Sequence, residues 1–261
     1  MRTFQFHHIL TFLLIGMLLL SFPSYGQSPK DTLRYQVDLN LSGRRISGTF
    51  SQVVVGGGFK VDFLYNNWHL ENTTSYRYNK TNTRLIEDNW YDLATLKYYP
   101  DGQKKLYPGV FSHYDNNLIY RVKSRHNYGV GVGSELDKGI MDLSLLAAIA
   151  KGNSSYNGSE FVNSDRDVSN RKNGLFLFRI DNSYSLAKKK INIFYQLFYF
   201  QSLKESTDYI FRLNSRINFK VFKSLSIYVA YDYRFENVHL ESLSNYNDIV
   251  LFGFNLALSG G

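Results

Sequence analysis

Ser124 and His126 lie two residues apart in a segment of alternating character, so in a β-strand their side chains would share one face. A histidine can activate a serine hydroxyl as a nucleophile when a third group orients the ring. The sequence assigns no acidic or amide partner to this pair, and a triad is recognised by geometry rather than by spacing. An ordinary strand surface is therefore the favoured interpretation, and a lipid-modifying hydrolase or acyltransferase is kept as the alternative.

Basic side chains form two rows at alternate positions. The rows are Arg121, Lys123 and Arg125 in one segment, and Arg212, Arg216 and Lys220 in a later one. Buried charges are normally paired, so one interpretation is an interior filled by ion pairs. The acidic partners expected for it are Asp38, Asp62, Glu71, Asp142 and Asp232. The other interpretation is a cationic pore lining that favours anions. Both interpretations make these six basic residues the candidate lumen-lining positions.

Metal and cofactor chemistry has little support in the sequence. Cysteine is absent, and the six histidines show no spacing typical of a metal site. Glycines at 129, 131 and 133 alternate within a predicted strand and are not followed by a helix, so they do not form a phosphate-binding loop. They are expected to leave room for bulky neighbours. We therefore expect no cofactor and no metal.

The first 26 residues have the plan of a secretory signal peptide. Arg2 is followed by an almost wholly apolar run over 9–22, then Pro23 and the small residues Ser24 and Gly26. The run is shorter than the roughly 20 residues that a spanning helix needs. Export removes the chain from nucleic acid, so the formal charge of +8 is not expected to serve nucleic-acid binding. Residues 27–261 are predicted to form a single domain.

The elements that must position the basic rows are strands, because the dominant pattern has a period of two. Aromatic residues make up 16% of the chain, which favours β structure, and only four prolines interrupt it. The predicted strands cover 33–42, 46–64, 68–79, 87–98, 106–115, 118–136, 139–152, 173–187, 190–203, 207–221, 224–237 and 246–258. The second is predicted to run unbroken through the glycines at 56–58.

The lengths of the strands and loops favour a membrane barrel over a soluble β-sandwich. Most strands exceed the roughly five or six residues of a typical soluble sheet, and a tilted strand needs about 9 to 11 to cross a bilayer. Short turns alternate with longer connections, of which 153–172 is the longest. This is the plan of bacterial outer-membrane barrels. The predicted fold is an all-β, antiparallel up-and-down transmembrane β-barrel of about twelve strands, with ten or fourteen as neighbouring alternatives.

Three segments resemble an uncharacterised outer-membrane family, the salt-induced (YdiY-like) proteins. They are the long hairpin over 47–78, the glycine-alternating strand over 121–133 and a terminal strand over 247–254 that contains Asp248. The resemblance implies one outer-membrane barrel and brings no substrate and no catalytic residues. Gly253, Leu256 and Leu258 also resemble the last-strand signal read by the barrel-insertion machinery, although the chain ends in two glycines rather than an aromatic residue.

The expected function is that of a non-enzymatic, outer-membrane envelope protein that is structural or passes a small solute. Its expected partners are outer-membrane lipids and lipopolysaccharide, and the insertion machinery during assembly. A third possibility is a surface-binding barrel whose long loop over 153–172 contacts a partner.

Overall fold

The computed structural model describes residues 33–46, 51–82, 84–100, 106–164 and 168–260. The predicted signal peptide over 1–26 lies outside this range, as do residues 101–105 and the final residue. Among the described residues, no helix is long and apolar enough to cross a membrane.

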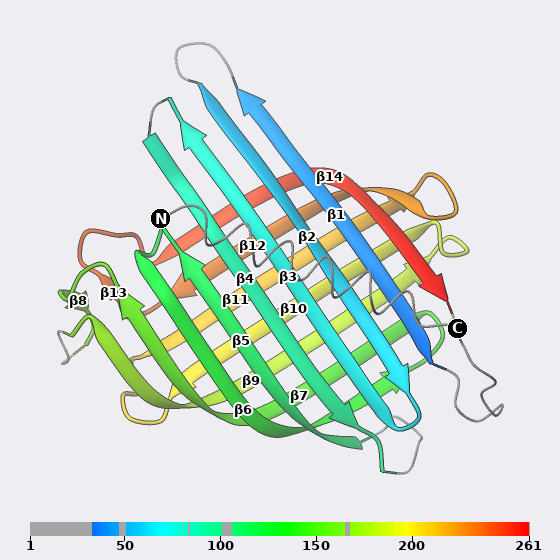
Figure 1. Cartoon of the computed structure of the whole chain (residues 1–261), viewed down its shortest axis with the longest axis horizontal. Helices are drawn as coiled ribbons and strands as arrows, with labels where there is room; N and C mark the ends of the chain where they lie inside the picture. Colours follow the sequence, from blue (N-terminus) through cyan, green and yellow to red (C-terminus); the bar gives the residue numbers. More distant parts are fainter. Residues whose placement is uncertain (1–32, 47–50, 83, 101–105, 165–167, 261) are drawn as a thin grey trace. The chain divides into compact units, whose positions relative to one another are not determined.

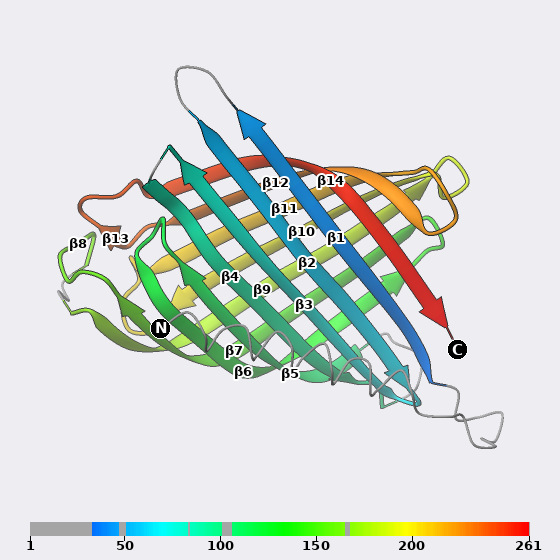
Figure 2. The same ribbon diagram turned by 45° about the horizontal axis from the view of Figure 1, so that its top comes forward.

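Twelve antiparallel strands close into a barrel (Figures 1 and 2). These are β1 (Arg34–Ile46), β2 (Gln52–Tyr65), β3 (Trp68–Thr81), β4 (Arg84–Tyr98), β5 (Leu106–Asn117), β6 (Val122–Asp137), β7 (Met141–Tyr156), β9 (Asn170–Leu186), β10 (Ile191–Ser202), β11 (Tyr209–Lys220), β12 (Leu225–Glu236) and β14 (Tyr246–Gly260). Each pairs with its neighbours in chain order, and β14 returns to β1, where Val37 lies opposite Leu258. The predicted fold class and strand number are confirmed.

The two largest differences between predicted and observed strand starts are explained by local backbone geometry. The second strand begins at Gln52 rather than 46, because β1 continues to Ile46 and pairs there with Gln52. The sixth begins at Val122 rather than 118, because 118–121 form a tight turn. In that turn the Arg121 amide donates to the Leu118 carbonyl at 3.1 Å, and Arg121 has a φ of 52°.

Glycines within the strands allow side chains to cross the neighbouring backbone. β2 runs through its three glycines without a break, as predicted. A Cβ at Gly133 on β6 would collide with the ring of Tyr107, which packs over this position from β5. The prediction that this glycine leaves room for a bulky neighbour is thereby confirmed.

The two ends of the barrel differ in their connections. One end carries tight turns such as Asn66–Asn67 between β2 and β3, and we call it the short-turn end. The opposite, long-loop end carries the β7–β9 and β12–β14 connections. These two loops pair through the short strands β8 (Phe161–Val162) and β13 (His239–Leu240). Phe161 and Leu240 join an apolar cluster with Tyr120, Val122, Tyr156 and Val238, which holds the loops together.

Candidate functional site

Alternate residues of every strand point into the barrel, and this interior is the candidate functional site. On β11, Arg212 and Arg216 face inward while Phe211 and Leu213 face outward. The inward direction is shown by contacts across the barrel, since Arg77 on β3 reaches Asp232 on β12 at 2.9 Å although these strands are not neighbours. The period of two therefore separates a charged interior from an apolar exterior.

The long-loop end of the interior is crossed by a buried network of two arginines and two carboxylates. Arg125 on β6 donates to Glu236 at 2.9 and 3.0 Å, and to Asp115 at 3.3 Å. Arg234 donates to both oxygens of Asp115 at 2.7 and 3.1 Å, and to Glu236 at 2.8 Å. All four residues are buried, and they connect β5, β6 and β12. Such an arrangement satisfies the charges of both arginines within the protein.

A second group lies deeper in the barrel and joins four strands, β3, β4, β11 and β12. Asp232 accepts a hydrogen bond from Arg77 at 2.9 Å, and it also accepts two from Arg212 at 3.3 Å each. The Arg212 guanidinium lies 4.1 Å from the ring centroid of Tyr91 on β4. Arg77 reaches Glu87 as well, at 3.6 Å.

A third network fills the short-turn end. Buried Lys97 on β4 donates to Glu71 and Glu135 at 2.6 Å each, and so bridges β3 and β6. Arg179 on β9 lies 3.5 Å from Glu71 and 2.5 Å from Asp181. The three networks thus cross the interior at successive levels.

Large apolar side chains occupy the space between the networks. They are Tyr91, Leu93, Tyr99, Tyr107, Phe111, Leu146, Ala148, Leu177, Phe198 and Phe200, which form one buried cluster. Interior positions of β4, β5, β7, β9 and β10 supply them. Well-packed aliphatic and aromatic groups exclude water as a protein core does. The interior thus contains a packed apolar cluster beside the ion pairs.

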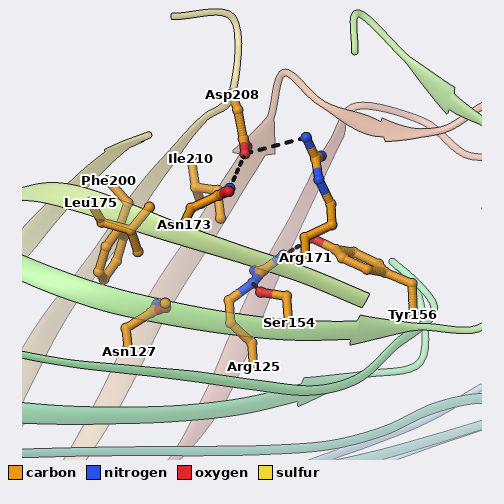
Figure 3. A pocket seen from close by; sticks show the side chains of 11 residues that line it. Arg125, Asn127, Ser154, Tyr156, Arg171, Asn173, Leu175, Phe200, Asp208 and Ile210 are labelled. Carbon is orange, nitrogen blue, oxygen red and sulfur yellow. Dashed lines mark hydrogen bonds and ion pairs between the residues drawn. The ribbon is translucent and has the colours of Figure 1, made fainter. Parts of the chain in front are cut away.

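Two cavities of different size lie among the interior side chains. The larger, of about 100 Å³, lies between the β1–β3 wall and the β11–β14 wall. The smaller, of about 30 Å³, lies beneath the loops at the long-loop end (Figure 3). There Asp208 accepts a hydrogen bond from Asn173 at 2.9 Å and lies 3.5 Å from Arg171. Arg171 also reaches Glu205 at 2.7 Å, which ties the β10–β11 loop to β9.

The six candidate lumen-lining residues fall into two groups. Arg125, Arg212 and Arg216 occupy interior strand positions. The other three are exposed: Arg121 lies in the β5–β6 turn, Lys123 near the start of β6, and Lys220 at the end of β11. The structure thus places the exposed three at the rims of the barrel, away from the packed interior.

Ser124 and His126 lie on the outer face of β6, on either side of the inward-pointing Arg125. The His126 ring packs on Tyr114, with ring centroids 4.6 Å apart. No hydrogen bond or ion pair joins Ser124 to His126, or His126 to a carboxylate, within the described residues. The geometry that a nucleophile and its base require is therefore not present in this pair.

One group of potential metal ligands was not predicted from sequence. Asp62, His69 and Glu71 face the interior at the short-turn end, with one potential ligand atom each within 4.8 Å of the others. Glu71 is already paired with Lys97 and Arg179, which supply the positive charge that a cation would bring. These contacts favour an ion-pair role for the three side chains.

Sequence reasoning named Asp62, Glu71 and Asp232 among the interior acids, and each forms an ion pair there. It missed Asp115 and Glu236, which anchor the long-loop network. Alternation could have placed both on interior faces, next to Arg125 on the neighbouring strand and Arg234 on the same strand. The contacts of Asp115 with Arg234 and of Glu236 with Arg125 form only when the barrel closes. Contacts across more than a hundred residues carry no local signal.

Comparisons with known proteins identify a family and several distant barrels. The family described as "Protein of unknown function, DUF481" matches residues 39–257. No curated protein matches. Among solved structures, the NanC porin is 9% identical with a TM-score of 0.45, covering 86% of this chain and 99% of that one. An outer membrane channel from Pseudomonas putida F1 is 10% identical with a TM-score of 0.44, covering 92% of this chain and 99% of that one.

The translocator domain of the autotransporter NalP from Neisseria meningitidis is 11% identical with a TM-score of 0.42, covering 96% of this chain and 95% of that one. The strand pairing described above, rather than these distant similarities, establishes the barrel. The comparisons name no response to salt, so that part of the resemblance stays a prediction. Because the family match extends over most of the sequence, the chain belongs to the DUF481 family of proteins of unknown function.

Proposed function

We propose that this protein is a non-enzymatic outer-membrane barrel that is closed to solutes and serves the envelope as a structural component. The proposed location in the outer membrane is supported by the apolar side chains on the outside of the barrel. Leu41, Val132 and Ile149 are 68%, 67% and 63% exposed, and they belong to a larger set of exposed apolar side chains on outward strand positions. A soluble protein rarely exposes contiguous apolar surface on this scale, whereas a membrane barrel requires it.

The packing of side chains across the interior is the observation that supports the functional part of the proposal. Twelve strands are compatible with either an open or a plugged barrel, so the side chains decide. Here three ion-pair networks and an aromatic cluster cross the interior, and the larger described cavity measures about 100 Å³. Before a solute could pass, Glu236 would have to separate from Arg125 and Arg234, which both donate hydrogen bonds to it.

In this location the partners would be outer-membrane lipids and lipopolysaccharide along the apolar exterior, and the insertion machinery during assembly. The signal peptide expected over 1–26 would direct the export. Ser124 and His126 would then be ordinary outward-facing residues, because His126 stacks on Tyr114 rather than engaging the serine.

Liposome swelling tests the proposal directly. Vesicles containing the refolded protein should swell in iso-osmotic arabinose no faster than protein-free vesicles, because the interior leaves no continuous path. Vesicles with an open porin provide the positive control, and a shift in gel mobility on heating verifies that the barrel is folded. Swelling at a rate comparable to that of the open porin would contradict the closed state. Recovery of the protein in the inner-membrane or soluble fraction of cells would contradict the location.

A further inference from the structure

Arg216 differs from the other interior arginines in having no acidic partner. The paired arginines are Arg77, Arg125, Arg179, Arg212 and Arg234, each of which lies within 4.0 Å of a carboxylate. Arg216 makes no such ion pair within the described residues, and its guanidinium instead lies 4.5 Å from the ring centroid of Tyr228. A cation left in a protein interior without a counter-charge is costly.

Arg216 and two asparagines on β11 and β14 carry buried polar atoms that are unsatisfied. The Nε atom of Arg216 and the Oδ1 atoms of Asn218 and Asn255 are buried and have no hydrogen-bond partner in the described part of the chain. Most buried polar groups in proteins are paired, so a cluster of unpaired ones calls for an explanation. Asp38, the acid facing this wall, already accepts hydrogen bonds from Gln36 at 2.8 Å and Asn255 at 3.5 Å.

Arg216 lines the larger of the two cavities described above. A cavity needs only roughly 10–15 Å³ to hold one water molecule, so about 100 Å³ leaves room for a small solute. Its lining amide and hydroxyl residues are Asn40, Ser42, Ser75, Asn89, Asn117, Asn214 and Asn247. Its charged lining comprises four arginines and three carboxylates, and Arg216 is the arginine without a partner.

Glycines of β2 form part of the wall of this cavity. Gly56 lines the cavity from β2, and a Cβ added there would lie 2.6 Å from the Oγ atom of Ser42. The Ser42 hydroxyl therefore reaches the cavity wall at a position that only a glycine on β2 leaves free. The glycine run that the sequence places in this strand thus has a role in shaping the cavity.

We propose that the cavity is a binding site for a small oxyanion whose carboxylate or phosphate group pairs with Arg216. The planar guanidinium offers two parallel N–H donors to such a group. The amide and hydroxyl groups of Asn40, Asn214 and Ser42 suit hydroxyl substituents on the same molecule. One unpaired arginine among balanced charges favours an anion of low charge. The site does not require the barrel to conduct, so it stands apart from the proposed closed state.

Isothermal titration calorimetry on the refolded, detergent-solubilised barrel tests the site with three probes. Gluconate carries a carboxylate with hydroxyls, inorganic phosphate is the second anion, and glucose is the uncharged control. Gluconate, phosphate or both should bind at one site, and glucose should not. Which anion binds identifies the acid group that the site accepts.

Variants connect the binding to the cavity. Arg216→Met should weaken anion binding at least tenfold, and Asn214→Leu should weaken it several-fold without changing any charge. Lys220→Gln is the matched control because it removes one positive charge from the same face of β11 at an exposed position, and it should bind as the parent does. Heat-dependent gel mobility confirms that each variant is folded. If Arg216→Met fails to fold, Asn214→Leu alone decides.

Three results would overturn the proposal. The first is that the parent protein binds neither anion. The second is that glucose binds as tightly as gluconate. The third is that the folded cavity variants, Arg216→Met or Asn214→Leu, bind as tightly as the Lys220→Gln control.

Discussion

Replacing Glu236 by glutamine should destabilise the barrel strongly, because it removes one of two negative charges that hold two buried arginines. Glu236 is 1% exposed and accepts hydrogen bonds from Arg125 at 2.9 and 3.0 Å and from Arg234 at 2.8 Å. After Glu236→Gln, both guanidinium groups would depend on Asp115 alone. Breaking a buried ion pair from one side costs about 3–5 kcal/mol, and the amide oxygen that remains favours the lower part of this range. We expect a loss of about 3 kcal/mol in the free energy of unfolding.

Urea-induced unfolding in lipid vesicles measures this loss, with the fluorescence of Trp68 and Trp90 as the signal. Glu241→Gln is the matched control, because Glu241 is exposed in the β12–β14 connection, and its change should stay within about 0.5 kcal/mol. The double variant Glu236→Gln/Arg125→Met should lose less than the sum of the two single losses, since each single change leaves a charge unpaired. The reasoning is refuted if folded Glu236→Gln unfolds at the same urea concentration as the control.

The remaining predictions concern four other parts of the molecule. Lys97→Met should also destabilise the barrel by about 3–5 kcal/mol in the same urea assay, because it leaves the Glu71 and Glu135 carboxylates without their shared cation. A loss no larger than that of the Glu241→Gln control would contradict this prediction. Gly133→Ala should lower stability by about 1–3 kcal/mol because the added methyl collides with the ring of Tyr107, and an unchanged unfolding midpoint would count against this packing. Phe161→Ala should expose the β7–β9 loop to limited proteolysis while the barrel stays folded, since this side chain packs in the loop cluster and against Arg171 near the start of β9. Purified protein should show no phospholipid turnover, and any turnover that is lost in His126→Ala would revive the enzyme alternative.

The strands could be predicted from sequence because each of them separates two different environments. In β11, Phe211 and Leu213 face outward while Arg212 and Asn214 face inward, so a period of two is visible along the chain. The same signal fails where both sides of the backbone meet similar surroundings. It also needs several residues to be seen. The pairing of β8 with β13 was missed because each of these strands is only two residues long.

The candidate site could be predicted only in outline. Alternation placed Arg125, Arg212 and Arg216 inward but could not say which of them would find a carboxylate. Pairing depends on which strands face each other across the closed barrel, and a single sequence holds no record of that. The unpaired state of Arg216 is therefore visible only in three dimensions.

Single-channel recording in planar lipid bilayers tests the closed state most directly. The parent protein is inserted from vesicles in which gel mobility confirms folding, and the current is followed at moderate voltage in potassium chloride. Because ion pairs and aromatic side chains cross the interior at successive levels, we expect a membrane current without conductance steps. Regular, long-lived conductance steps of a size typical of open porins would contradict the closed barrel.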